Sequence, residues 1–144
     1  MLGATGQLLG TFSQIEVDAE VGRQASVAIE ILSWRRDSAL LGDAVVIHIG
    51  NNGVFTSDQF DRMMQILTDV PNVVFINMKV PRQWEGPNNA VLAEKVSAHP
   101  NAVLIDWHTI GSENGGYFWS DDIHLRPAGA AAYSSLIANY LPEP

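Results

Sequence analysis

The sequence lacks cysteine, which excludes disulfide bonds, thiolate zinc sites and a cysteine nucleophile. Basic residues are also few, with 8 Lys and Arg against 16 Asp and Glu, and the net charge of −8 would repel a phosphate backbone. We therefore expect no nucleic-acid partner. No apolar run approaches the roughly 18 residues of a membrane span. The first residues show no basic segment followed by an apolar core, so no signal peptide is predicted within this sequence.

What is present is the composition of an ordinary globular domain. The 144 residues are 47% hydrophobic and 17% charged, which suits a single folded domain over residues 1–144 with a substantial core. The four histidines show no metal-ligand spacing, so we expect no metal. No phosphate-cradling glycine motif is present, and we expect no cofactor.

Strand-like and helix-like segments alternate along the chain. Strands are predicted at residues 14–18, 44–49, 72–80 and 102–106. Helices are predicted at residues 24–36, after a capping box at 56–59, at residues 88–98, and from Pro127 onward. Strands separated by helices indicate right-handed crossovers and a parallel sheet between helical layers. In such folds the functional sites lie at the carboxyl ends of the strands.

The first candidate site is the pair Asp121 and His124, in a loop just before the last helix. A carboxylate three residues before an imidazole can orient it, and the imidazole can then act as a general base. Taken alone, the same pattern also describes a solvated loop whose Asp lies near a helix N-terminus for electrostatic reasons. Both interpretations stay open on these residues alone.

Two further turns follow predicted strands. Residues 50–53 read Gly-Asn-Asn-Gly, in which an Asn amide can donate a hydrogen bond to a developing oxyanion. Gly22 lies at a helix entrance, where a backbone N–H can bind an anion. Both segments also fit plain turns, because Gly and Asn favour turns for backbone reasons. Trp84 follows a third strand and can floor a pocket or close the edge of the core.

Taken in order, these segments resemble the SGNH hydrolase family. The likeness is greatest to the C-terminal domain of membrane acyltransferases that O-acetylate peptidoglycan. Residues 18–24 are similar to the family's second block, residues 50–53 to its third, residues 80–85 (Val-Pro-Arg-Gln-Trp-Glu) to a stretch of that subgroup, and residues 120–129 to its fifth block. The resemblance covers almost the whole chain.

The resemblance implies roles for individual residues. Asp121 and His124 would be two triad members, and Gly22 and Asn52 would be the oxyanion donors. The pocket candidates are Gly50, Arg82 and Trp84. The implied function is a serine esterase or O-acetyltransferase that acts on cell-envelope glycan esters through an acyl-Ser intermediate. The implied setting is extracytoplasmic, fused to or working with a membrane acyltransferase domain.

One block of the family is missing. The family begins with a strand that ends in Gly-Asp-Ser, whereas this sequence opens Met-Leu-Gly-Ala, which resembles the residues just after the nucleophile. The implied fold is a three-layer α/β/α, flavodoxin-like sandwich that lacks its first, central strand. We therefore expect an inactive chain of marginal stability, or one repaired by pairing of residues 14–18 with residues 44–49, or by pairing between chains.

Three alternatives remain. The chain can be a nucleophile-less protein that binds a glycan or a partner. Another serine can serve as nucleophile, with Ser13, Ser26 and Ser57 the nearest candidates. A flavodoxin-like signalling domain shares the topology, but Lys79 has no accompanying acidic cluster in the first segments.

Overall fold

A computed structural model of the chain describes residues 2–141 and has a parallel three-stranded sheet at its centre. The strands are β1 (Ala44–Ile47), β2 (Asn72–Ile76) and β3 (Ala102–Ile105), in the order β1-β2-β3. Val45 is in register with Val73, and Phe75 with Leu104. The parallel α/β architecture predicted from the sequence is confirmed.

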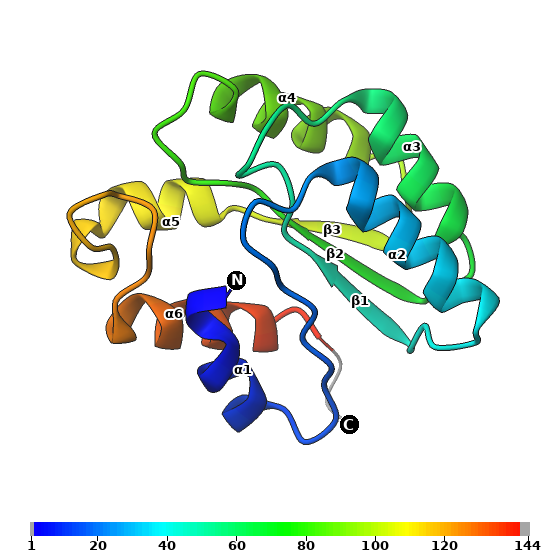
Figure 1. Cartoon of the computed structure of the whole chain (residues 1–144), viewed down its shortest axis with the longest axis horizontal. Coiled ribbons are helices and arrows are strands. Elements are labelled where there is room, and N and C mark those ends of the chain that lie inside the picture. Colours follow the sequence, from blue (N-terminus) through cyan, green and yellow to red (C-terminus); the bar gives the residue numbers. More distant parts are fainter. Residues whose placement is uncertain (1, 142–144) are drawn as a thin grey trace.

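Helices cover both faces of this sheet (Figure 1). One face carries α2 (Ala25–Asp37), α3 (Ser57–Ile66) and α4 (Glu85–Val96). The other face carries α1 (Thr5–Thr11), α5 (Trp107–Glu113) and α6 (Pro127–Ala138), with short 3-10 turns η1 (Leu2–Ala4) and η2 (Gly115–Tyr117) beside them. Among residues 2–141, no helix is both long enough and apolar enough to cross a membrane.

The central strand β2 contributes side chains to two hydrophobic cores, one on each face of the sheet. Successive strand residues point to opposite faces, so Val73 and Phe75 join the core under α2, α3 and α4, while Val74 and Ile76 join the core with α5 and α6. The capping box predicted at residues 56–59 is present, because the Thr56 hydroxyl accepts from the Gln59 N–H and the Gln59 side chain accepts from the Thr56 N–H.

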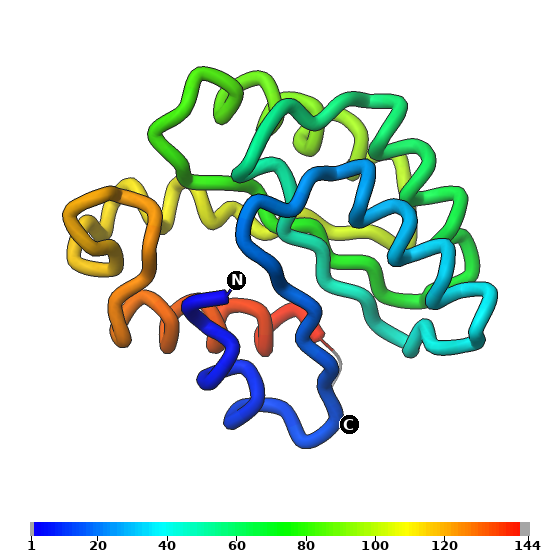
Figure 2. Tube along the Cα trace, in the orientation of Figure 1, coloured from blue at the N-terminus to red at the C-terminus, as the bar shows by residue number. Residues whose placement is uncertain are grey.

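Several sequence predictions need correction. Residues 14–18 form no strand and do not pair with β1, so the predicted repair by direct pairing is wrong. The segment is nevertheless extended, as the trace in Figure 2 shows between α1 and α2. Residues 102–106 were expected to form a strand within a sheet between helical layers, but β3 is an edge strand on which Val103 is 43% exposed. Helix α5, which follows β3 directly, was not predicted.

Candidate functional site

Asp121 and His124 form the pair that their spacing predicted. Oδ2 of Asp121 lies 2.6 Å from Nδ1 of His124, and Oδ1 accepts the backbone N–H groups of Ile123 and His124 at 3.0 and 2.9 Å. The bond to His124 and then these two N–H groups hold the pKa of Asp121 well below its usual range. The His124 side chain is 77% exposed, and within residues 2–141 no hydrogen bond to its Nε2 is present.

The loop that carries this pair is held in shape by its own backbone. Phe118 and Leu125 form an isolated antiparallel bridge, and the N–H of Trp119 donates to the carbonyl of His124 at 2.8 Å. The Arg126 guanidinium lies 5.0 Å from the centre of the Trp119 ring, in cation–π geometry. The imidazole is therefore presented from a structured hairpin just before α6.

The Gly22 and Asn52 segments lie side by side. The Gln24 amide donates to the carbonyls of Gly22 and Asn52, at 3.2 and 2.8 Å. The Asn52 amide in turn donates to the Arg23 carbonyl at 3.4 Å. Gly22 has a φ of +75°, a backbone conformation that favours glycine. Two turns that are 28 residues apart in sequence are thus joined into one wall.

Gly50 shapes the second of these turns. Its φ is +107°, and a Cβ on it would lie 2.8 Å from Cε of Met78. Asn88, fully buried on α4, donates to the carbonyls of Gly50 and Gly53 and accepts the N–H of Phe55. Sequence reasoning missed Asn88, because an Asn inside a helical pattern gives no sign that it reaches a distant loop.

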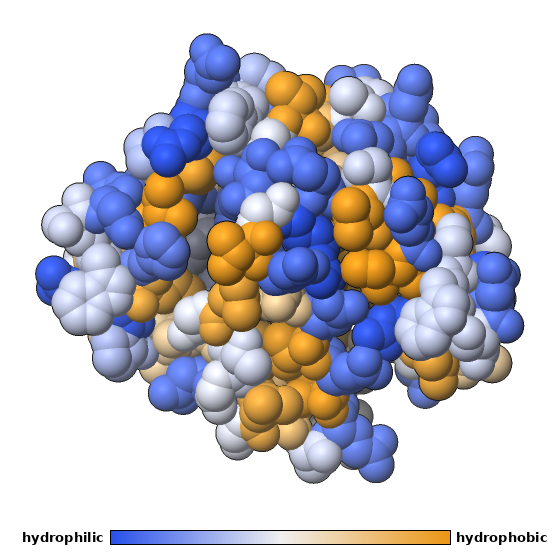
Figure 3. Space-filling view, in the orientation of Figure 1, coloured by the Kyte–Doolittle hydropathy of each residue, from blue (hydrophilic) through white to orange (hydrophobic). Residues whose placement is uncertain are grey.

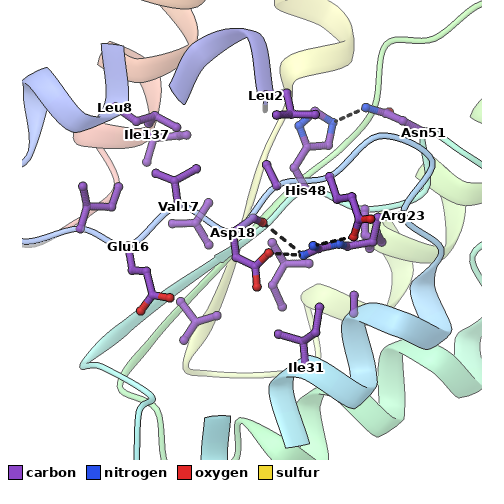
Figure 4. Close-up of a pocket in the computed structure, with 18 of the residues that line it drawn as sticks. Leu2, Leu8, Glu16, Val17, Asp18, Arg23, Ile31, His48, Asn51 and Ile137 are labelled. Atoms are coloured by element: carbon purple, nitrogen blue, oxygen red, sulfur yellow. Dashed lines mark hydrogen bonds and ion pairs between the residues drawn. The ribbon is translucent and has the colours of Figure 1, made fainter. Parts of the chain in front are cut away.

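A single cavity of about 810 Å³ brings most of the predicted site residues together. His124, Gly22, Gly50 and Asn52 all line it. In the close-up, Leu2, His48 and Asn51 lie toward one end of the cavity, whereas Leu8, Val17 and Ile137 lie toward the other (Figure 4). Asp121 is not part of the lining and takes part through His124.

His48 links the sheet to the last helix. Its Nδ1 lies 2.7 Å from the hydroxyl of Tyr133 on α6. Its Nε2 lies 3.4 Å from the Asn51 amide. Burial lowers the pKa of His48 to about 3 and raises that of Tyr133 far above its usual value, so both groups are neutral near pH 7.

Arg82 and Trp84 do not line this cavity. Arg82 is exposed, and Trp84 is the half-buried N-cap residue of α4. The adjacent Glu85 accepts the Val80 N–H, and its Oε1 lies 3.2 Å from Nε2 of His108, a contact that no sequence spacing indicated. Of the Val-Pro-Arg-Gln-Trp-Glu stretch, Glu85 therefore contacts His108 beyond the end of β3, and Val80 is buried in the core under α2, α3 and α4.

Charged side chains form one rim of the cavity. Arg23 pairs with Asp18 at 2.6 Å and with Glu20 at 3.2 Å, and Arg35 pairs with Asp18 at 3.5 Å. Burial opposes ionisation of Asp18, but the two guanidinium groups outweigh it and hold the pKa of Asp18 below its usual value. The space-filling view shows hydrophilic side chains between the apolar groups over α1 and α2 (Figure 3).

No serine lines the cavity within residues 2–141. Ser13, Ser26 and Ser57 are all exposed elsewhere on the surface. Lys79, the residue considered for a signalling domain, lies over the Phe118 ring at 5.5 Å. Among the described residues, no group of three or more His, Asp or Glu is arranged to hold a metal ion.

Comparison with known proteins gives clear relatives, although no family model matches the chain. The chain is 36% identical over 95% of its length to YrhL of Bacillus subtilis. It is 34% identical over 85% of its length to the O-acetyltransferase OatA of Staphylococcus aureus, and 30% identical over 98% to the peptidoglycan O-acetyltransferase OatA of Listeria monocytogenes. The chain spans about a fifth of the length of these relatives.

The fold also has a solved counterpart. The C-terminal catalytic domain of peptidoglycan O-acetyltransferase A from Streptococcus pneumoniae, solved with a methylsulfonyl adduct, superposes with a TM-score of 0.86 at 21% identity. The match covers 97% of this chain and 86% of the other. The homologues of this chain are thus peptidoglycan O-acetyltransferases, and its fold is that of such a catalytic domain, as the SGNH resemblance implied.

Proposed function

We propose that this chain is the greater part of an SGNH-type O-acetyltransferase or esterase domain that acts on glycan esters of the cell envelope. Two of its relatives are named O-acetyltransferase and peptidoglycan O-acetyltransferase, and the chain spans about a fifth of their length. We also propose that it works fused to, or beside, a membrane acyltransferase domain outside the cytoplasm. No metal or cofactor takes part in this proposal.

The arrangement of His124 with Gly22 and Asn52 around one cavity carries the proposal. In the proposed reaction, a serine hydroxyl attacks the acetyl carbonyl, and Nε2 of His124 takes the hydroxyl proton. Asp121, bonded to Nδ1, holds the ring and stabilises the imidazolium. The Gly22 N–H and the Asn52 amide stabilise the oxyanion. Collapse of the intermediate expels the donor's alkoxide, which takes the proton from His124, and leaves acetyl-Ser.

We propose that the serine comes from polypeptide outside these 144 residues, because no serine among residues 2–141 lines the cavity. A sugar hydroxyl or water then attacks acetyl-Ser, and His124 takes its proton. His124 returns that proton to the serine oxygen as the acyl–oxygen bond breaks, which leaves an acetylated sugar or acetate and free serine. Removal of a triad nucleophile costs on the order of 10⁶ in kcat in a well-studied protease, so we expect the chain alone to be inactive.

Fluorophosphonate labelling tests the proposal. We would compare the 144-residue chain with a chain extended at its N-terminus by an apolar strand ending in Gly-Asp-Ser. Labelling is expected only in the extended chain, at the added serine, and it should disappear in His124→Ala. Asp121→Asn should slow labelling strongly, because it removes the carboxylate that holds the ring. Asp122→Asn is the matched control and should label normally. A labelled serine in the unextended chain would contradict the proposal.

A second function is favoured by the same lack of a lining serine. The chain would then be a catalytically inactive domain that binds a glycan or a partner in this cavity. Calorimetric titration with a chitin tetrasaccharide tests it. Saturable binding to both chains, with no label in the extended chain, would support this function over the first.

A further inference from the structure

The hairpin that carries His124 has two different faces. Phe118 and Leu125 lie opposite one another in its antiparallel bridge, and both pack against the core with α5 and α6. The next pair toward the turn is Trp119 and His124, joined by the backbone bond from the Trp119 N–H to the His124 carbonyl. Successive residues of a strand point to opposite faces, so the side chains of Trp119 and His124 share the face that is turned away from this core.

The exposure of these residues agrees with the pairing. Phe118 is buried, whereas Trp119 is 51% exposed and the His124 side chain 77% exposed. Trp119 and His124 both line the cavity. Directly opposed residues of an antiparallel pair have Cβ atoms about 5 Å apart. A large flat ring is therefore exposed beside the imidazole that acts as the base in the proposed function.

Arg126 completes this face of the hairpin. It lies two residues beyond His124, diagonally across from Trp119, and its guanidinium is 5.0 Å from the centre of the Trp119 ring. Arg23 and Arg35 are paired with carboxylates, but within residues 2–141 no side chain or carbonyl accepts a hydrogen bond from the Arg126 guanidinium. Its N–H donors therefore stand next to the ring with no protein partner among these residues.

The chemistry of this face suits a sugar ring. The C–H groups on one face of a pyranose are apolar and carry a small positive charge, so they stack on the electron-rich face of an indole. The hydroxyl and carbonyl groups at the edge of the sugar accept hydrogen bonds, which a guanidinium donates. An anionic ligand fits less well, because Asp121 and Asp122 lie in the same hairpin and the net charge of the chain is −8.

We propose that Trp119 and Arg126 form a binding subsite for an N-acetylated sugar of the acceptor glycan. The pyranose ring stacks on Trp119, and its acetamido carbonyl accepts from Arg126, because a carbonyl oxygen is a stronger acceptor than a hydroxyl. A hydroxyl at the edge of the stacked ring then faces His124. The role of His124 in this inference rests on the proposed function, but binding of the sugar requires no serine.

NMR titration of the 144-residue chain with a chitin tetrasaccharide tests the subsite. The chain has four Trp, whose indole N–H signals report each ring separately. We expect the Trp119 signal to shift saturably, whereas the signal of Trp34, a similarly exposed ring on α2, should not move. No saturable shift of the Trp119 signal would overturn the inference, and this measurement needs no variant that could misfold.

Substitutions of the two exposed Trp measure the contribution of the ring. Trp119→Ala should weaken binding about tenfold, the effect of one aromatic stacking contact, and Trp119→Phe should weaken it less because it keeps a ring. Trp34→Ala is the matched control and should bind as the wild type does. Equal weakening by Trp119→Ala and Trp34→Ala would overturn the inference.

Arg126→Met tests the hydrogen-bonding part of the subsite, because it keeps an aliphatic side chain over the ring and removes the donors. The wild-type chain should bind the chitin tetrasaccharide about fivefold more tightly than cellotetraose, which has no acetamido groups, and the variant should lose this preference. Equal binding of the two sugars by the wild-type chain would overturn the assignment of Arg126 to the acetamido group.

The outcome for this subsite is separate from the outcome for the proposed reaction. Serine labelling of the extended chain without a shift of the Trp119 signal would overturn only the subsite. A saturable shift of the Trp119 signal without serine labelling would support the subsite and overturn only the proposed reaction.

Discussion

The two sides of the sheet are built differently. On the β2–β3 side, the strands pair, and Phe60, Met63 and Phe75 are fully buried between them and the helices. On the β1 side, the strand edge faces a cavity, and ion pairs of Arg23 and Arg35 hold the far wall. The β2–β3 side is stabilised by close packing, which is strong and insensitive to salt. The far wall of the β1 side is stabilised by surface charge pairs, which are weak.

Truncation of a buried side chain should show the largest difference in stability loss between the two sides. Phe75→Ala should lower the free energy of unfolding by about 3–5 kcal/mol, because it leaves a cavity in a dense core. Val45→Ala, on the open side, should cost about 1 kcal/mol or less, since Val45 already borders empty space. Urea unfolding measures both. Equal losses would show that the β1 side is as well packed as the other.

Gly129→Ala tests how tightly the His124 hairpin is fitted to α6. A Cβ at this position would lie 2.2 Å from the Tyr117 carbonyl oxygen, so the backbone must move, and we expect a loss of about 2–3 kcal/mol. Gly86→Ala in α4 is the control, because nothing lies within 4 Å of its Cβ, and it should be neutral or slightly stabilising. Thermal unfolding compares the two variants.

Asn88→Ala tests the join between the closed side and the site. The substitution removes the bonds to Gly50, Gly53 and Phe55 and leaves the buried Phe55 N–H without its acceptor, so a loss of about 2 kcal/mol is expected. Asn114→Ala, which loses one local bond at an exposed position, should cost much less. If both variants unfold at the same denaturant concentration, the turn at residues 50–53 is held by other contacts.

His48 should make stability depend on pH. Its folded pKa of about 3 is below the unfolded value near 6.5, so between these values the unfolded chain takes up a proton that the folded chain does not. The free energy of unfolding should therefore decrease as pH falls from 6.5 toward 3, by at most about 1.4 kcal/mol per pH unit. In His48→Gln, the free energy of unfolding should depend less on pH between pH 7 and 5, as measured by urea unfolding at each pH. An unchanged slope would mean that His48 titrates normally.

The smallest effect is expected from the charged wall. Arg35→Gln removes the pairs with Glu16 and Asp18, whose side chains are 70% and 36% exposed, so the loss should be below about 1 kcal/mol. This loss in the free energy of unfolding should be smaller still in 1 M NaCl, because salt screens the wild-type ion pairs. A loss above 2 kcal/mol that persists in salt would show that the wall contributes packing as well as charge.

Local patterns predicted much of the fold and one part of the site. The runs of β-branched residues at 44–49 and 72–80 indicated strands, and the Thr56 capping box placed the start of α3, because these signals act within a few residues. The spacing of Asp121 and His124 allowed a contact but left a solvated loop open, and the family resemblance selected the pair. Helix α5 was missed because it is only seven residues long and begins directly after β3.

Local sequence patterns could not predict contacts between segments that are distant in the sequence. Glu85 with His108, His48 with Tyr133, and Asn88 with the turn at residues 50–53 join elements that are 23 or more residues apart. Arg82 and Trp84 were assigned to the pocket by resemblance, and the structure puts them outside the cavity lining. Which of these residues contact one another or line the cavity depends on their distance in space, and sequence spacing does not encode that distance.

The sequence by itself determined the alternation of strands and helices, the absence of cysteine chemistry, and the Asp121–His124 pair, because all of these depend on composition or on neighbours along the chain. Only the tertiary structure decided that residues 14–18 stay apart from β1 and that a cavity separates them. Strand pairing depends on which backbones meet in space, and residues 14–18 carry a strand pattern whether or not a partner is present.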